Sequence, residues 1–176
     1  MISVFVGTSV DGFLARADDT FNFLRPFEGE PHGYEEFVAE VDAIVIGRRT
    51  FEVVLGIQPH WHYGKKRVVV LSSRPVDFSS VRGGVIEQMS GIPAEIVNKL
   101  VATGAHNLYV DGGFTIQQFL RAGLINRLVI TRVPVLIGQG IPLFGPLLSD
   151  IKLLHISTKA YANGMVSSEY HTVLSS

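Results

Sequence analysis

The chain has 176 residues, of which 47% are hydrophobic, and its 15 lysines and arginines nearly balance its 16 aspartates and glutamates. This length fits a single domain over residues 1–176, and the near-neutral charge excludes the basic field that nucleic-acid binding or membrane-surface attachment requires. The apolar runs are too short to span a membrane, and the absence of cysteine excludes disulfides and thiolate metal sites. The opening MISVFVGTSVDG lacks the basic region of a signal peptide, so we expect a cytoplasmic protein.

Short β-rich apolar runs alternate with helical segments along the chain. The pattern predicts strands at 2–8, 41–46, 67–71, 108–110 and 127–133. It predicts helices at 34–40, 50–55 and 93–102, and a fourth helix that begins with a capping box of Thr115 and Gln118 and ends at Gly123. Two extended runs around AYANG, within 152–173, predict a hairpin. We therefore expect a three-layer α/β/α domain with a mixed, mainly parallel sheet and a C-terminal antiparallel hairpin.

The stretch GRRT follows the second predicted strand, at the edge where open sheets bind ligands. Thr50 is expected to cap a helix, which would leave backbone N–H groups pointing outward as an anion site. Gly47 allows close approach of a ligand, and Arg48 and Arg49 supply guanidinium groups suited to phosphate. A surface arginine pair beside a capped helix explains the same residues equally well.

Two further strand ends carry polar or glycine signals. In VVVLSSRP, Ser72, Ser73 and Arg74 repeat the phosphate-binding chemistry, although a local turn is the simpler explanation. In YVDGGFTIQQF, Gly112 and Gly113 would let a diphosphate or a ring approach the main chain, although a tight strand-to-helix turn would also use glycine. Two such strand ends together favour nucleotide binding.

The segment PHWHYGKK contains His60 and His62 at a spacing that could hold a metal ion. The chain has no cysteine, and no third ligand stands beside these histidines in the sequence. We therefore expect no metal site and interpret the segment as a loop that crosses over the sheet.

Five sequence pieces run in order from Ser9 to His171 and cover nearly the whole chain. They are SVDGFLA, GRRTFE, VLSSR, VDGGFTIQQFLRAGLINRLVITRVPVLIGQGIPLF and SSEYH. Together they resemble the dihydrofolate reductase-like superfamily, and most closely its branch that contains the C-terminal reductase domain of the riboflavin-biosynthesis deaminase/reductase. The resemblance implies hydride transfer from NADPH to a small pteridine-like or pyrimidine-derived molecule, and a homodimer.

The resemblance also implies roles for individual positions. Residues Gly47 to Thr50 would bind NADP phosphates, residues Ser72 to Arg74 would flank the adenosine 2′-phosphate, and Gly112 to Ile116 would line the pyrophosphate and nicotinamide side. The bond between Gly112 and Gly113 would be cis, as in dihydrofolate reductases. The complete set of implied cofactor-binding residues is Leu14, Ala15, Gly47, Arg48, Arg49, Thr50, Leu71, Ser72, Ser73, Arg74, Gly112, Gly113, Phe114, Thr115 and Ile116.

The proton donor is less well defined, because folate reductases place a carboxylate on their first long helix and the matching helix is shorter here. Glu36 and Asp11 are the candidate acids, and a solvated helix face and an Asp-Gly turn are their respective alternatives. Thr131 matches a hydroxyl that faces the substrate ring. A nucleotide-binding module that holds NADP(H) without efficient turnover remains the alternative function, and a scaffold without a ligand would leave the polar strand ends unexplained.

Overall fold

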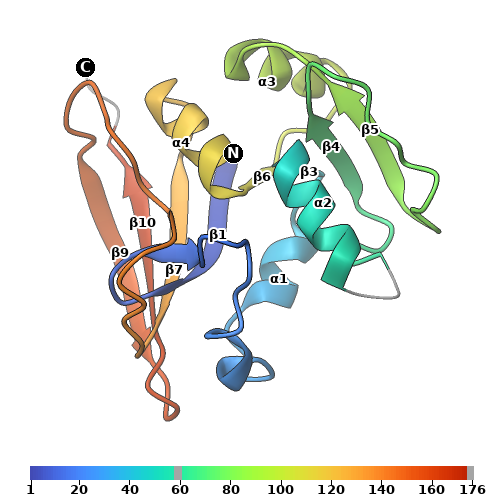
Figure 1. Ribbon diagram of the computed structural model, residues 1–176. Coiled ribbons are helices and arrows are strands. Elements are labelled where there is room, and N and C mark those ends of the chain that lie inside the picture. The colour runs from blue at the N-terminus through green and yellow to red at the C-terminus, as the bar shows by residue number, and fades with distance from the viewer. Residues whose placement is uncertain (58–60, 174–176) are drawn as a thin grey trace.

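The computed structural model describes residues 1–57 and 61–173 (Figure 1). Within these ranges the chain forms an eight-stranded sheet, a two-stranded sheet, four α-helices and one short 3₁₀ helix. The strands are β1 (Ile2–Ser9), β2 (Phe13–Ala15), β3 (Ala43–Gly47), β4 (Arg67–Leu71), β5 (Val85–Met89), β6 (Leu108–Asp111), β7 (Arg127–Val133), β8 (Ile141–Pro142), β9 (Leu153–Ala160) and β10 (Val166–Thr172). The helices are η1 (Arg25–Phe27), α1 (Tyr34–Ala39), α2 (Arg48–Ile57), α3 (Pro93–Ala102) and α4 (Gly113–Arg121).

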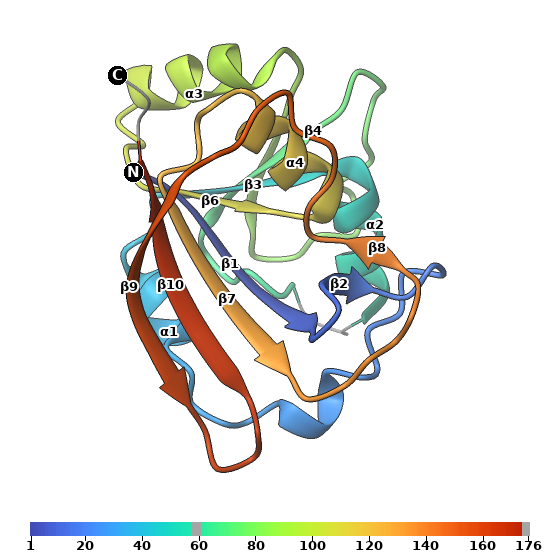
Figure 2. The ribbon, with the colours of Figure 1, turned by 90° about the vertical axis from the view of Figure 1, so that its left-hand side faces the viewer.

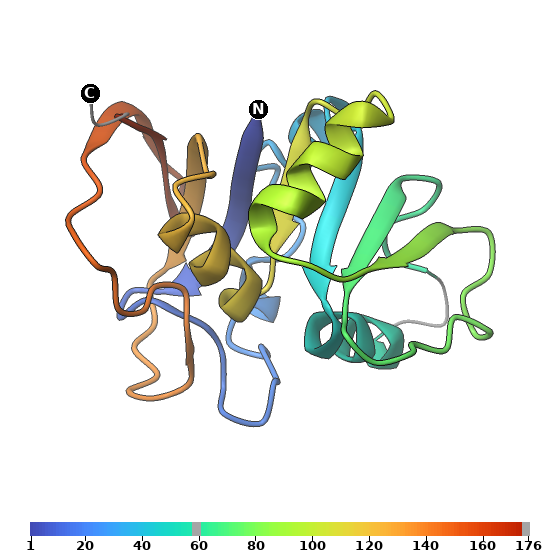
Figure 3. The same cartoon turned by 90° about the horizontal axis from the view of Figure 1, so that it is seen from above.

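The large sheet has the strand order β5-β4-β3-β6-β1-β7-β10-β9. The first six strands in this order are parallel, whereas β10 runs antiparallel to both β7 and β9. Seen from above, the hairpin of β9 and β10 lies at the opposite end of the molecule from β4 and β5 (Figure 3). The predicted mixed, mainly parallel sheet with a C-terminal antiparallel hairpin is therefore confirmed.

Two hydrophobic clusters cover the two faces of the sheet. On one face, side chains of α3 and α4, such as Ile96 and Phe119, pack with Val4 of β1. On the other, side chains of α1 and α2, such as Phe37 and Phe51, form the second cluster. Because β1, β3, β4 and β6 are covered on both faces, their residues are almost all buried, which explains why their sequences are continuously apolar. The three-layer architecture follows directly from this pattern.

Two parts of the sheet do not follow from simple apolar runs. The edge strand β5 contains Glu87 and Gln88 and is only partly buried, so its sequence does not show the continuous apolar pattern of the central strands. The short strands β2 and β8 form the separate two-stranded sheet, and Figure 2 shows them as two short neighbouring arrows. The pair matters because β2 and β8 both contribute residues to the cavity described below. In the part of the chain that the structure describes, every helix is too short or too polar to cross a bilayer.

Candidate functional site

A cavity of about 620 Å³ lies at the carboxyl ends of β1, β3 and β6, which are neighbours in the sheet. The chain leaves β3 into α2 on one face of the sheet and leaves β6 into α4 on the other. These connections run in opposite directions, because α2 leads to β4 and α4 leads past β1 to β7. The cavity therefore lies at a topological switch point, the usual ligand-binding position of an open α/β sheet.

The N-termini of α2 and α4 meet at this cavity because of two glycines. A Cβ atom on Gly47 would lie 2.8 Å from the Thr115 Oγ1 of α4. A Cβ atom on Gly112 would collide with the Thr50 hydroxyl of α2. Residues from the first turn of both helices line the cavity, so two positive helix ends act on the same space.

The expectation that Thr50 and Thr115 cap these helices is wrong. Helix α2 begins at Arg48 and α4 at Gly113, which places each threonine within the first helical turn. The N-cap position of α4 is Gly112, and no side chain caps it. Strand β3 runs almost directly into α2, and β6 into α4. The Thr50 hydroxyl therefore lies against Gly112, and the Thr115 hydroxyl lies against Gly47, instead of against the backbone of their own helices.

The connection from β6 to α4 also corrects the expected cis bond, because the peptide bond between Gly112 and Gly113 is trans. Gly112 makes the turn with a φ of 91° and a ψ of 129°, a conformation open to glycine and costly for other residues. At Gly113, a Cβ atom would lie 2.9 Å from the Pro142 carbonyl oxygen of β8. Both glycines are thus required by local geometry and close packing.

Both arginines of GRRT line the cavity, and each forms an ion pair within the protein. The Arg48 Nε donates to Glu52 Oε1 at 2.7 Å, one turn further along α2. The Arg49 Nε donates to Asp19 Oδ1 at 2.8 Å, and this arginine side chain is 64% exposed. Exposed pairs of this kind contribute little to stability, so an anionic ligand can replace either carboxylate at small cost.

Most residues of the implied cofactor-binding set line the cavity. They are Leu14, Ala15, Gly47, Arg48, Arg49, Thr50, Leu71, Gly112, Gly113, Phe114 and Thr115. Ile116 does not, because it is fully buried in the cluster beneath α4.

The segment after β4 lies next to the cavity but does not line it. Leu71, at the end of the strand, belongs to the lining, whereas Ser72, Ser73 and Arg74 do not. The Ser72 hydroxyl donates to the Arg74 carbonyl oxygen at 2.7 Å and accepts the Arg74 N–H at 3.1 Å. The local turn is therefore present, and a role at the outer end of an extended ligand stays a prediction.

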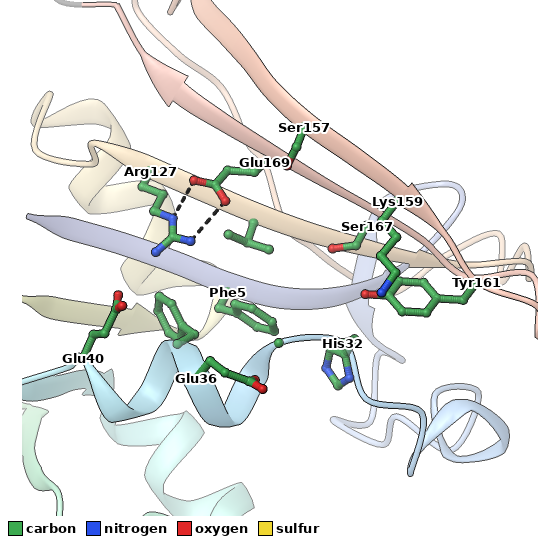
Figure 4. A pocket seen from close by; sticks show the side chains of 13 residues that line it. Phe5, His32, Glu36, Glu40, Arg127, Ser157, Lys159, Tyr161, Ser167 and Glu169 are labelled. Carbon is green, nitrogen blue, oxygen red and sulfur yellow. Dashed lines mark hydrogen bonds and ion pairs between the residues drawn. The ribbon is translucent and has the colours of Figure 1, made fainter.

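The candidate acids and Thr131 do not line this cavity. The Asp11 carboxylate accepts the backbone N–H of Gly138 at 2.7 Å and that of Ile137 at 3.3 Å, which holds the loop after β7. A hydrogen bond with Ser9, together with these backbone bonds, holds the pKa of Asp11 below its usual value. Glu36 lines a second, smaller cavity beside α1 (Figure 4). Thr131 is buried, and its hydroxyl donates to the Ser167 hydroxyl at 3.0 Å.

Among the described residues, three carboxyl groups line the cavity, and Asp19 and Glu28 contribute two of them. The third belongs to Asp111, a residue that sequence reasoning missed. It is the last residue of β6, and its Oδ1 accepts the Gly112 N–H at 2.8 Å. Burial raises the pKa of Asp111, and the Gly112 hydrogen bond only partly opposes this shift. The sequence VDGG could have indicated Asp111, because it places an aspartate at the end of a buried strand, at the ligand-binding edge of the sheet. We interpreted only the two glycines that follow it.

Aromatic side chains surround Asp111. His62, Tyr63 and Tyr109 line the same cavity, and the Tyr109 hydroxyl donates to the Phe5 carbonyl oxygen at 3.0 Å. Burial, reinforced by the nearby Asp111 carboxyl, raises the pKa of Tyr63 and Tyr109 well above their usual values. The same effects raise the pKa of Tyr34 to about 12. This part of the cavity therefore favours neutral groups and a protonated carboxyl.

Of the two histidines considered as metal ligands, only His62 belongs to the described residues. His60 lies outside the described residues, whereas His62 lines the cavity and stacks on Tyr34 with ring centroids 6.5 Å apart. Within residues 1–57 and 61–173, no three histidine or acidic side chains form a group that could hold a metal ion.

The strand order, the switch-point cavity and the closing hairpin together define a dihydrofolate reductase-like α/β domain. Residues 1–167 match the RibD C-terminal domain family, and the chain belongs to this family. The superfamily predicted from the five sequence pieces is thereby confirmed. A reductase-like role follows for the protein.

Three relatives illustrate the similarity. The chain is 30% identical over 164 residues to the uncharacterized protein YwjB of Bacillus subtilis (strain 168), and the match covers 92% of both chains. A crystal structure from Shewanella sp. PV-4, provisionally assigned to riboflavin biosynthesis, is 32% identical with a TM-score of 0.89 and covers 98% of this chain and 99% of its own. Dihydrofolate reductase from Enterococcus faecalis, complexed with NADP(H), shares the fold at 17% identity and a TM-score of 0.61, covering 98% of this chain and 96% of its own.

Proposed function

We propose that the protein is an NADPH-dependent reductase that transfers a hydride to a small pteridine-like or pyrimidine-derived heterocycle. One observation carries the proposal. Two helix N-termini and two arginines converge on a cavity that also contains the carboxyl of Asp111. The helix N-termini and the arginines suit phosphate groups, and the Asp111 carboxyl suits a ring nitrogen.

The residues around the helix starts fit a phosphate-bearing dinucleotide. Backbone N–H groups in the first turns of α2 and α4 would bind the pyrophosphate, and Arg48 and Arg49 would neutralise the charges of the cofactor's phosphates. Ser72 and Arg74, which follow Leu71 in the chain, would act together with Arg48 on the adenosine 2′-phosphate and favour NADPH over NADH. The Enterococcus faecalis reductase of the same fold is complexed with NADP(H), which supports this choice of cofactor.

The chemistry at the substrate ring would divide between the cofactor and Asp111. When bound, NADPH supplies the hydride. Because the Asp111 Oδ1 accepts the Gly112 N–H, its Oδ2 is the oxygen that would hold a proton, and burial, which raises the pKa of Asp111, favours this protonated form. Donation of this proton to a ring nitrogen would make the neighbouring carbon electrophilic and would help it accept the hydride.

The alternative, a module that binds NADP(H) without efficient turnover, is not favoured. It rested on the missing carboxylate of the first helix. Asp111 places a carboxyl in the same cavity as the helix starts, from the end of β6 instead of from α1.

We also propose a homodimer. Strand β9 ends the sheet, and its outer edge has no partner strand among the described residues. All eight of its residues are exposed, including Leu153, Leu154 and Ile156. Unpaired strand edges with apolar side chains bind further strands readily, so a second copy of the chain would suit this edge. Light scattering should give a dimer for the protein and a monomer for an Ile156→Lys variant.

Titration with NADPH and with NADH tests the cofactor assignment. The ring of Trp61, the single tryptophan, lies 5.4 Å from that of Tyr63, which lines the cavity, so its fluorescence reports on binding. We expect tight and selective binding of NADPH. The substrate screen then starts with dihydrofolate and ribosylaminopyrimidines and follows NADPH oxidation. Failure to bind either cofactor would restrict the relationship to one of fold.

A further inference from the structure

The turn between β1 and β2 is tied to the loop between β7 and β8, which comprises residues 134–140. Asp11 lies in this turn, and its Oδ2 accepts the Gly138 N–H at 2.7 Å, while its Oδ1 accepts the Ile137 N–H at 3.3 Å. Beside it, the Val10 N–H donates to the Val135 carbonyl oxygen at 2.9 Å. Two segments that lie far apart in the sequence are thus joined, mainly through the Asp11 carboxylate.

An Asp-Gly turn alone does not require these contacts. The Asp11 side chain is exposed, and the backbone groups that it binds belong to another part of the chain instead of to its own turn. A hydrogen bond with Ser9, together with those to Gly138 and Ile137, holds the pKa of Asp11 below its usual value, so the side chain is ionised at neutral pH. Hydrogen bonds to an ionised carboxylate are stronger than neutral ones, which suits a residue that fixes a loop.

The loop that Asp11 holds leads directly into β8, as Figure 2 shows. Strand β8 pairs with β2, with Ile141 opposite Ala15. Directly after β8, the Leu143 N–H donates to the Gly12 carbonyl oxygen at 3.0 Å. Strand β8 is therefore fixed at its start by Asp11, through the loop, and at its end by the neighbouring glycine.

Strands β2 and β8 form an apolar wall of the larger cavity. The wall consists of Leu14 and Ala15 from β2 and Ile141 from β8, and all three line the cavity. It packs tightly on the start of α4, because a Cβ atom on Gly113 would lie 2.9 Å from the Pro142 carbonyl oxygen and 3.2 Å from the Ile141 side chain. The position of β8 therefore sets how much space remains between the apolar wall and the helix start.

The apolar wall lies at one end of the cavity, and the predicted 2′-phosphate site lies at the other. Leu71 ends β4, whereas the wall follows β1, and β3 and β6 lie between these two strands in the sheet. An apolar surface suits the carbon atoms of a ring and not a phosphate. We infer that Asp11 is a positioning residue. Through the loop 134–140 and β8 it fixes the apolar wall against which the nicotinamide lies, an assignment that rests on the proposed function.

Asp11→Asn is the informative variant, because it keeps the shape of the side chain. Its amide NH₂ replaces one acceptor oxygen, so either Gly138 or Ile137 loses the partner of its N–H. Asp42→Asn is the matched control. Asp42 is also exposed, and its Oδ2 accepts two backbone N–H groups, at 2.7 and 2.8 Å, from a distant segment. It precedes β3 and so lies at the amino end of the sheet, opposite the cavity.

Calorimetry on the full chain compares NADPH with adenosine 2′,5′-bisphosphate, which has the 2′-phosphate but lacks the nicotinamide. Asp11→Asn should raise the Kd for NADPH about tenfold if the wall is formed in roughly one molecule in ten. It should leave the Kd for the bisphosphate unchanged, because that ligand does not reach the wall. Asp42→Asn should change neither Kd. A general loss of structure would weaken both ligands, so the difference between them isolates the positioning role.

Hydrogen exchange tests the same role without a ligand. In Asp11→Asn the Leu143 N–H should exchange faster, since β8 is no longer fixed at its start. The amides of β3 should exchange as in the parent protein, because the central sheet does not depend on Asp11.

Several results would overturn the inference. They are unchanged exchange at Leu143, faster exchange throughout β3, equal losses of affinity for both ligands, and an unchanged Kd for NADPH in Asp11→Asn. Failure of the proposed function looks different. In that case neither ligand binds the parent protein, whereas Leu143 still exchanges faster in Asp11→Asn, which supports Asp11 as the residue that positions β8.

Discussion

Replacing Arg48 with alanine separates the proposed cofactor role of this residue from its role in folding. The Arg48 side chain is 43% exposed, and its ion pair with Glu52 joins neighbouring turns of α2. Exposed pairs at this spacing contribute about 0.3–0.5 kcal/mol to stability. The variant should therefore unfold at nearly the same denaturant concentration as the parent protein.

The expected loss of NADPH affinity is much larger. A hydrogen bond from arginine to phosphate is worth about 1.5–3 kcal/mol, which corresponds to a Kd increase of about 10- to 150-fold. If the lost contact is to the 2′-phosphate, the Kd for NADH, which lacks this group, should change far less. Fluorescence titration with both cofactors measures the difference.

Glu52→Gln provides the matched control for Arg48→Ala. It removes the same ion pair, so its effect on stability should be similar, but it leaves the guanidinium group free and should not weaken NADPH binding. Equal losses for NADPH and NADH in Arg48→Ala would refute the 2′-phosphate role. Unchanged affinity for both cofactors would refute any contact between Arg48 and the phosphates.

Further predictions concern packing and pH. Gly47→Ala places a methyl group against the Thr115 hydroxyl of α4 and should lower the free energy of unfolding by about 1–3 kcal/mol in urea titrations. Asp111 has a raised pKa in the folded protein, so the protein should lose stability as pH rises from the ordinary aspartate pKa through that raised value, and Asp111→Asn should remove this slope and reduce turnover. Glu169 has a lowered pKa, chiefly because of its hydrogen bond with Arg127. Its stabilising effect is therefore present above the ordinary glutamate pKa and is lost as pH falls through the lowered value. Glu169→Gln should weaken this loss of stability in acid.

Each of these predictions has a contrary outcome. A Gly47→Ala protein as stable as the parent would show that α2 and α4 can separate at no cost. If Gly47→Ala does lower the free energy of unfolding, adding Thr115→Ala to the same chain should restore part of that loss. An Asp111→Asn protein with the parent pH profile and full turnover would exclude Asp111 as the proton donor. Acid unfolding that is identical in Glu169→Gln would show that the pair with Arg127 does not stabilise the folded state.

The sequence predicted the central part of the fold well because strands that are buried on both faces have continuous apolar sequences. Strands β4 and β7 and helix α3 have the predicted bounds, since continuous apolar runs and a proline at the helix start define them locally. The starts of α2 and α4 were placed two residues too late. Threonine is common at helix caps, but here a glycine at each strand end let the helix begin sooner.

The candidate site was predicted in part for the same reason. Gly47, Arg48 and Gly112 could be selected because residues after parallel strands gather at one edge of the sheet. Glu36 was selected because it lies on the helix that carries the acid in folate reductases, and Asp11 as an acid near the expected pocket; the structure places Asp11 against a loop backbone and Glu36 in another cavity. Their surroundings depend on segments far away in the sequence.

The sequence by itself determined the alternation of strands and helices, the mainly parallel sheet and the edge at which a ligand would bind, because hydrophobic periodicity and strand ends are local properties. Only the tertiary structure decided which carboxyl is buried in the cavity. Asp111 is set apart from the other acids by the burial and the tyrosines around it, and Tyr63 and Tyr109 come from different parts of the chain. A raised pKa is a property of that assembled environment, and no stretch of sequence around an aspartate encodes it.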